Sequence, residues 1–172
     1  MRRIAKACKI SVGNLTYHFP TADRLLEAVI QNMLEGYSEQ LKHYEEFGAP
    51  EGQDILDQLI EFIIRDAVSS TTSSLMIELW AMAKHDPSKA KYVNMAYEMG
   101  SQVIKALILR VSPATPEAVA QKAAVTMLVF SEGSTALFSR QHNLNCEAED
   151  MIGLAKQTIR TMISPLLIAA KR

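Results

Sequence analysis

The spacing of apolar residues constrains the fold of this chain more than any other feature. Leu, Ile, Val, Met and Ala recur every three or four residues along almost all of its 172 positions, which is the repeat of one face of an α-helix. No segment sustains the alternation of apolar and polar residues that a half-buried strand requires. The sequence therefore predicts an all-α protein.

Proline and glycine mark the breaks between the periodic segments. Gly-Ala-Pro at 48–50, Asp-Pro at 86–87 and two further proline dipeptides at 112–116 stand where helices are expected to end or begin. The helices predicted between these breaks cover residues 2–8, 12–18, 21–47, 52–68, 72–85, 88–111, 116–141 and 147–169. Thr115 is expected to cap the helix after it, and Pro165 to kink or end the last one.

The composition is that of an ordinary globular protein, with 48% hydrophobic and 22% charged residues. Cys8 and Cys146 show no spacing typical of a disulfide framework or a zinc cluster, which favours a reducing compartment. Lys9 and Asn14 interrupt any signal-peptide core, and no apolar run approaches the roughly 20 residues of a membrane span. These features predict a cytoplasmic protein without a membrane contact, a metal or a cofactor.

Charge is distributed unevenly along the chain. Residues 1–24 contain five cationic side chains and one carboxylate, whereas residues 25–172 contain 13 cationic and 18 acidic side chains. A basic segment on an acidic remainder indicates an anionic partner for that segment. A solvated basic surface with no partner is the alternative interpretation.

The basic segment contains two short predicted helices joined by a tight turn at residues 9–11. In the second helix, which Ser11 is expected to cap, Val12, Leu15 and Phe19 share one face by their spacing. The remaining face carries polar and aromatic side chains, namely Asn14, Thr16, Tyr17 and His18. Cationic side chains bind DNA phosphates, and polar side chains form hydrogen bonds with base edges. This composition is therefore typical of a helix that enters a DNA groove.

The stretch RRIAKACKISVGNLTYHFPTADRLLEAV resembles the helix-turn-helix of the tetracycline-repressor (TetR) family of transcription regulators. It matches the family pattern at Ile4, Ala5, Ile10, Ser11, Gly13, Leu15, Phe19, Leu25 and Leu26. The resemblance implies a dimeric regulator that binds operator DNA through this motif and a small-molecule inducer through its remaining helices. The candidate DNA-binding residues are Arg2, Arg3, Ser11, Val12, Gly13, Asn14, Thr16, Tyr17, His18 and Arg24.

Three departures from the family pattern bear on this motif. Thr16 stands where the family usually has Tyr, and its hydroxyl is expected to reach a phosphate. Ala22 replaces a Lys that commonly contacts the DNA backbone, and Arg24 is close enough to substitute for it. Family members have a further helix before this point, so Ile4, Leu15 and Phe19 are expected to be partly uncovered.

Methionine and aromatic residues gather on the helices of the remaining chain. They are residues of a protein core or, because Met is flexible and polarizable, of an adaptable ligand pocket. The resemblance favours the pocket for the group as a whole. The candidate ligand-binding residues are Phe62, Met76, Glu78, Trp80, Met95, Met99, Met127 and Phe130, with a solvent-facing carboxylate as the alternative for Glu78.

The last two predicted helices carry many small and apolar residues over more than one face. Such a helix pair needs a second surface to cover it, and a two-fold partner would complete a four-helix bundle. Packing against the rest of the same chain is the alternative. The candidate dimer-interface residues are Ala120, Ala124, Met127, Ser131, Ser134, Phe138, Ile152, Ile159, Met162 and Ile163.

The sequence contains no phosphate-binding loop, nucleophile elbow or zinc-protease motif, and no enzymatic activity is predicted. Residues 1–46 are expected to form the DNA-binding domain with its linking helix, and residues 47–172 the ligand-binding and dimerisation domain. The function expected is that of a ligand-responsive repressor that binds duplex DNA as a homodimer. A helical ligand-binding or protein-interaction module that does not bind DNA is the alternative.

Overall fold

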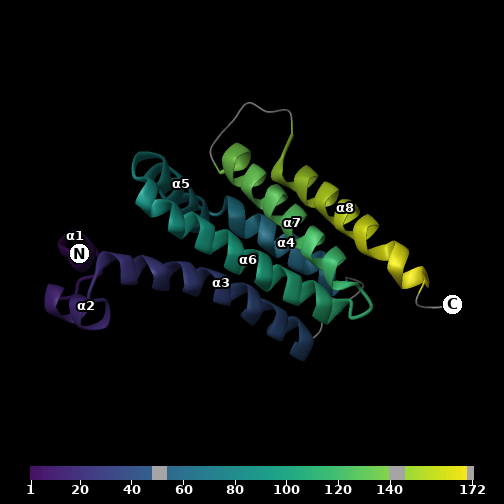
Figure 1. Cartoon of the computed structure of the whole chain (residues 1–172), viewed down its shortest axis with the longest axis horizontal. Helices are drawn as coiled ribbons and strands as arrows, with labels where there is room; N and C mark the ends of the chain where they lie inside the picture. Colours follow the sequence, from purple (N-terminus) through teal and green to yellow (C-terminus); the bar gives the residue numbers. More distant parts are fainter. Residues whose placement is uncertain (48–53, 140–145, 170–172) are drawn as a thin grey trace. The chain divides into compact units, whose positions relative to one another are not determined.

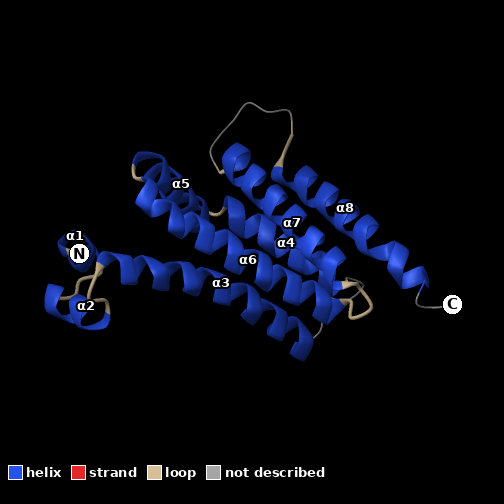
Figure 2. Cartoon of the chain, in the orientation of Figure 1, coloured by secondary structure: helices blue, strands red, loops and turns tan. Residues whose placement is uncertain are grey.

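The computed structural model describes residues 1–47, 54–139 and 146–169, with the backbone alone described at 41, 44, 45 and 163–169. These ranges contain eight α-helices, one short 3₁₀ helix and no strand (Figures 1 and 2). The elements are α1 (Arg2–Ala7), α2 (Val12–His18), α3 (Ala22–Phe47), α4 (Ile55–Val68), α5 (Ser70–His85), η1 (Pro87–Lys89), α6 (Ala90–Val111), α7 (Glu117–Phe138) and α8 (Ala148–Ala169). The all-α prediction is confirmed.

The chain forms two compact units, which are described separately below. The head comprises residues 1–35, and the body comprises residues 36–172. Helix α3 runs from the head into the body, so the division falls within a helix. None of the described helices has both the length and the apolar character needed to cross a bilayer.

Local hydrogen bonds explain where several helices begin. Ser11 and Asp54 cap α2 and α4, because each side chain accepts a hydrogen bond from a backbone N–H of the first turn. Ser69 alone separates α4 from α5, and its hydroxyl oxygen accepts from the Thr72 N–H at 3.2 Å. This cap starts α5 at Ser70, two residues before the predicted start at Thr72.

One expectation about helix ends is wrong, and of the kink or end expected at Pro165 the structure contradicts the end. The Thr115 hydroxyl donates to the Ser112 hydroxyl at 2.9 Å. Pro116 occupies the N-cap position of α7 and makes no side-chain cap. Helix α8 continues past Pro165 to Ala169, so the proline does not end it.

Helix α7 is the central element of the body. It contacts α4, α5, α6 and α8, and α6 and α8 lie along two sides of it in Figure 1. The apolar core around it consists of Leu56, Ile60, Ile63, Ile64, Ile104, Ile108, Ala120, Ala123, Ala124, Met127, Ile152, Ala155 and Ile159. The alanines of α7 permit a close approach of the neighbouring helices because their side chains are small.

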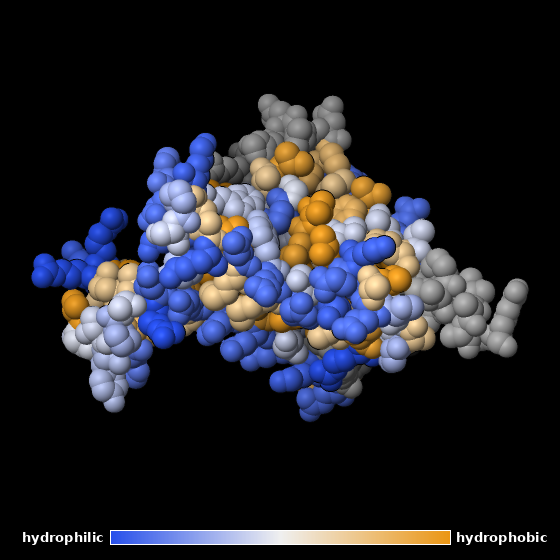
Figure 3. All heavy atoms as spheres, viewed as in Figure 1, coloured by the Kyte–Doolittle hydropathy of each residue, from blue (hydrophilic) through white to orange (hydrophobic). Residues whose placement is uncertain are grey.

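The outer face of α7 is apolar over several turns. After Lys122, its exposed residues are Val125, Val129, Gly133, Ala136 and Leu137, none of which is charged. Val129 is 67% exposed, and Leu154 of α8 is 47% exposed. Figure 3 shows apolar side chains at the surface in the region of α7 and α8. A surface helix of a monomer normally places charged residues on such a face.

Candidate functional site

The turn between α1 and α2 is fixed by backbone hydrogen bonds. The Lys9 N–H donates to the Lys6 carbonyl at 3.2 Å, and the Ile10 N–H donates to the Ala5 carbonyl at 3.0 Å. This pair of bonds is a Schellman motif, which requires a left-handed residue at its centre. Lys9 occupies that position with a φ of 56°. The motif sets the direction in which the chain enters α2.

We expect Lys9→Gly to raise the free energy of unfolding of the head by about 1 kcal/mol, because a left-handed conformation costs an L-residue about 1–2 kcal/mol. Lys6→Gly removes the same charge from the last turn of α1, where the backbone is helical, and should lower stability by up to about 1 kcal/mol. Urea unfolding followed by circular dichroism would measure both changes. A loss of stability in Lys9→Gly would contradict the strain assigned to this turn.

Helix α2 has one buried face and one exposed face. Leu15 is only 5% exposed, whereas Tyr17 is 83% exposed. His18 is also exposed, and its ring meets the Tyr17 ring edge-on with centroids 5.1 Å apart. Asn14 is exposed on the same short helix, whose first turn is held by the bond from its N–H to the Ser11 oxygen at 3.0 Å. The three polar and aromatic side chains are therefore accessible to a partner.

The expectation of a partly uncovered head is correct for some residues and wrong for others. Ile4 is 40% exposed, and Phe19 is half-buried. Leu15, however, is fully buried within the described chain.

The surroundings of the exposed face are basic. Arg2, Arg3, Lys6 and Lys9 are all exposed, and residues 1–22 contain no carboxylate side chain. In the helix cap the Ser11 hydroxyl oxygen accepts a hydrogen bond from the Asn14 N–H, so the hydroxyl can still donate a hydrogen bond to a partner molecule. The head thus combines cations, hydrogen-bond donors and an exposed aromatic ring.

Two side chains predicted to reach DNA are already engaged. The Thr16 hydroxyl donates to the Val12 carbonyl at 2.9 Å, with the Gly13 carbonyl at 3.2 Å. Its hydrogen is used within α2, so a phosphate contact would require this bond to break. Arg24 forms an ion pair with Glu27 at 3.1 Å. An exposed pair is worth at most about 1 kcal/mol, so the Arg24 guanidinium can exchange it for a phosphate.

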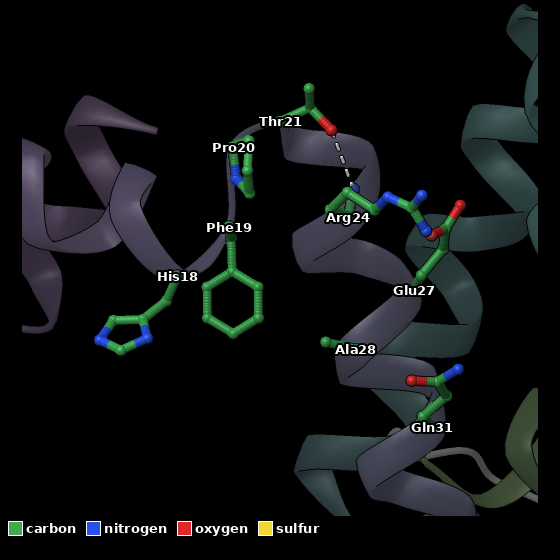
Figure 4. Close-up of a pocket in the computed structure, with 8 residues that line it drawn as sticks. All are labelled: His18, Phe19, Pro20, Thr21, Arg24, Glu27, Ala28 and Gln31. Atoms are coloured by element: carbon green, nitrogen blue, oxygen red, sulfur yellow. Dashed lines mark hydrogen bonds and ion pairs between the residues drawn. The ribbon is translucent and has the colours of Figure 1, made fainter.

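A surface hollow of about 470 Å³ lies in the head where α2 ends and α3 begins (Figure 4). Its wall includes Phe19, whose ring points toward α3 near Ala28, and its rim carries Arg24 and Glu27. The Thr21 hydroxyl caps α3 there by accepting from the Arg24 N–H at 3.1 Å. The hollow is open to solvent and groups no set of catalytic side chains.

The candidate ligand residues of the body differ in their burial. Glu78 is exposed on α5, which agrees with the alternative interpretation of a solvent-facing carboxylate. Met76 and Met127 are fully buried. Met127 lines a residual cavity of about 10 Å³ in the apolar core, which has room for one water molecule at most. The half-buried candidates are Phe62, Trp80, Met95, Met99 and Phe130.

Trp80 and Phe62 belong to a polar and aromatic network that joins five helices of the body. The Trp80 indole N–H donates to the Tyr97 hydroxyl oxygen at 2.7 Å, and the Tyr97 hydroxyl is hydrogen-bonded to the carboxyl of Glu132 on α7. The Phe62 ring meets the Tyr37 ring edge-on with centroids 5.9 Å apart. Tyr37, Tyr97 and Glu132 were not predicted as site residues.

Asp66 on α4 extends this network. Its carboxylate accepts hydrogen bonds from the Tyr37 hydroxyl at 3.0 Å and from the Thr72 hydroxyl at 3.0 and 3.1 Å. Burial, followed by the negative charge of Asp66, raises the pKa of Tyr37, and Glu132 adds to the effect. Tyr37 therefore lies under the influence of two carboxyl groups.

Glu132 is the most perturbed carboxyl group of this network. Burial raises its pKa from 4.5 to about 7, although the hydrogen bond from Tyr97 acts in the opposite direction. Its Oε2 is fully buried and has no hydrogen-bond partner among the residues that the structure describes, and the same holds for the Tyr92 and Ser134 hydroxyl groups. Such atoms are rare in folded proteins because each costs about 1–3 kcal/mol.

Comparison with solved structures found a protein of similar fold. The structure of GusR from Salmonella enterica superimposes with a TM-score of 0.59 over 95% of this chain and 84% of GusR, at 22% sequence identity. No protein-family model and no curated protein sequence matches the chain. At this identity the likeness shows a shared fold.

The structure corrects which side chains of α7 and α8 can meet a partner. Several interface candidates are buried inside the single chain, namely Ala120, Ala124, Met127, Ser131, Ser134, Ile152 and Ile159. Phe138 and Met162 are half-buried, and the side chain of Ile163 lies outside the described residues. The buried alanines and serines of α7 thus serve the internal packing, and the large apolar side chains that remain exposed are those of Val125, Val129, Leu137 and Leu154.

Proposed function

We propose that this protein is a DNA-binding transcription regulator that binds duplex DNA through α2 of its head. The observation that carries the proposal is the two-sided character of α2. Leu15 fixes the helix to the head, while Asn14, Tyr17 and His18 are exposed beside four cations. Cations on phosphates and polar tips on base edges are the two kinds of contact that operator recognition needs.

Gly13 supports a close approach of α2 to its partner. A Cβ built at this glycine would meet only the Ser11 hydroxyl oxygen, at 3.9 Å. Nothing inside the head therefore requires a glycine here. A DNA backbone that packs on the first turn of α2 would require one.

The apolar outer face of α7 supports a homodimer. A two-fold axis beside α7 would bury Val125, Val129 and Leu137 of both copies. Such a dimer would present two copies of α2 to successive major grooves, about one helical turn of DNA apart. An effector bound in the body would shift the population toward a spacing that does not fit the operator, which makes the protein a ligand-responsive repressor.

The proposal predicts DNA binding that weakens steeply as salt rises. Electrophoretic mobility shifts with DNA from upstream of the protein's own gene would measure it at several salt concentrations. Replacing Arg2, Lys6 and Lys9 together by Ala should reduce the slope of log K against log salt by about 0.9 for each phosphate that the variant no longer neutralises.

The matched control replaces three exposed lysines of the body, Lys42, Lys84 and Lys122, by Ala. It removes the same charge and should leave the slope unchanged. Absence of binding at low salt, or equal effects of the two triple variants, would contradict a DNA-binding head.

A further inference from the structure

We propose that the effector of this protein is an organic cation, held in the body by the carboxylate of Glu132 and the aromatic side chains of Trp80 and Tyr97. The inference rests on the proposed function, because it names the chemical class of the ligand to which the regulator responds. It replaces Glu78, the carboxylate among the candidates from the sequence, with a residue inside the helical bundle.

The first argument is the position of Glu132. Its Oε2 is buried without a hydrogen-bond partner, whereas the residue as a whole is half-buried. Trp80 and Tyr97 are also half-buried, so a ligand from solvent can reach part of all three side chains. The hydrogen bonds from Trp80 to Tyr97 and from Tyr97 to Glu132 hold them together. One carboxylate oxygen is thus buried without a partner among the described residues, and a ligand that displaces the half-buried side chains around it would satisfy it.

The second argument is charge. The pKa of Glu132 is set by burial and by Tyr97, with no cationic side chain acting on it. The negative charges of Glu132 and of Asp66 on α4 both raise the pKa of Tyr37 on α3, so a second carboxyl group lies in this neighbourhood. On α8, Lys156 and Arg160 are paired with Glu61 and Asp57 of α4, each at 2.8 Å. An anionic ligand would meet like charge here, whereas a cation would supply the missing counter-charge.

The third argument is the aromatic lining. Trp80, from α5, contributes a ring held by its bond to Tyr97. Phe62 and Tyr37 add an edge-to-face pair from α4 and α3. The faces of aromatic rings attract cations, and the attraction is stronger in a desolvated site. Carboxylate and rings together favour a quaternary or protonated amine over a neutral molecule of the same shape.

The pKa of Glu132 gives this proposal a pH signature. The group is ionised above a pKa of about 7 and neutral below it, and a cation binds the ionised form. The ionised fraction rises from about one tenth at pH 6 to about nine tenths at pH 8, so the Kd of a permanently charged cation should fall about tenfold. A neutral molecule of the same shape should show no such change.

Fluorescence of Trp80, the single tryptophan of the chain, reports binding without any DNA. The probes are phenyltrimethylammonium and its uncharged isostere tert-butylbenzene, titrated at pH 6 and pH 8. At pH 8 we expect the cation to bind more tightly than the isostere. The cation itself should bind about tenfold more tightly at pH 8 than at pH 6. Glu132→Gln should lose the pH dependence of cation binding and should show a smaller preference for the cation, because only the aromatic rings then favour it.

The matched control is Glu78→Gln, which removes an exposed carboxylate from α5 and should behave as the wild type. Tyr97→Phe provides a second variant, because losing its hydrogen bond raises the pKa of Glu132 further. The midpoint of the pH dependence should then move upward. The proposal is overturned if the wild type binds neither probe at millimolar concentration, binds both equally, or shows equal cation affinity at pH 6 and pH 8.

The two proposals fail separately. Cation binding to Trp80 without any DNA binding would contradict the regulator and leave the ligand assignment standing. DNA binding without cation selectivity would retain the regulator and reject the cationic effector.

Discussion

Replacing Ala124 by glutamate is expected to unfold the body, not merely to separate a dimer. Ala124 is 0% exposed and lies in the apolar core with Ile60, Ile108 and Ile159. A carboxylate forced into this core has no cation to pair with, and an unpaired buried charge costs roughly 3–5 kcal/mol. Thermal melting followed by circular dichroism would measure the loss.

Val129→Glu tests the dimer without unfolding the body. Val129 is 67% exposed, so the isolated fold should change in stability by no more than about 0.5 kcal/mol. If α7 forms a two-fold interface, the new carboxylates are buried in it, and dimers should dissociate at micromolar concentration. Sedimentation velocity distinguishes the two species.

Ala118→Glu is the control for both variants. It introduces the same residue on the same helix, at an exposed position before the apolar face begins. This variant should remain folded and dimeric. A wild-type protein that sediments as a monomer, or a Val129→Glu variant that stays dimeric, would rule out the α7 interface.

The contrast between Ala124 and Val129 shows what periodicity predicts. The three- and four-residue spacing identified the long helices, because any helix that packs on a core has to carry an apolar stripe. Helix α7 is apolar on two faces, and periodicity cannot tell which face meets the core of its own chain. Ala120, Ala123 and Ala124 pack internally, where α4, α6 and α8 contact α7, whereas Val125 and Val129 lie outside.

The network around Glu132 could not be predicted in the same way. Tyr37 and Asp66 are 29 positions apart, and Trp80 and Tyr97 are 17 positions apart. No local pattern connects such pairs, because the packing of whole helices brings them together. One signal was present, since Glu132 is the only charged residue between Lys122 and Arg140. A lone carboxylate in an apolar helix is a candidate for a functional group, because carboxylates are seldom buried and their pKa is often perturbed at functional sites.

The faces of α2 were predictable because the helix is short and amphipathic, and they allow a test of how it docks. Tyr17→Ala should weaken operator binding by about 1–3 kcal/mol if Tyr17 makes a good base contact. That loss corresponds to a roughly 5- to 150-fold rise in Kd. The melting temperature should hardly change, because Tyr17 is 83% exposed and alanine favours a helix.

Leu15→Ala should have the opposite effect. Leu15 is 5% exposed and anchors α2, so the substitution is expected to destabilise the head by roughly 2–5 kcal/mol. Any loss of DNA binding should disappear at temperatures low enough to keep the head folded. Mobility shifts and thermal melts on the same two variants would separate recognition from stability.

Asn14→Ala completes the assignment of the exposed face. If the Asn14 amide reaches a base edge, the variant should change which operator bases are preferred, whereas a uniform loss of affinity would assign the contact to a phosphate. Both outcomes leave α2 in the groove with the orientation described here. The orientation is rejected if Tyr17→Ala unfolds the head while Leu15→Ala preserves the fold and abolishes binding, because Leu15 would then face the DNA.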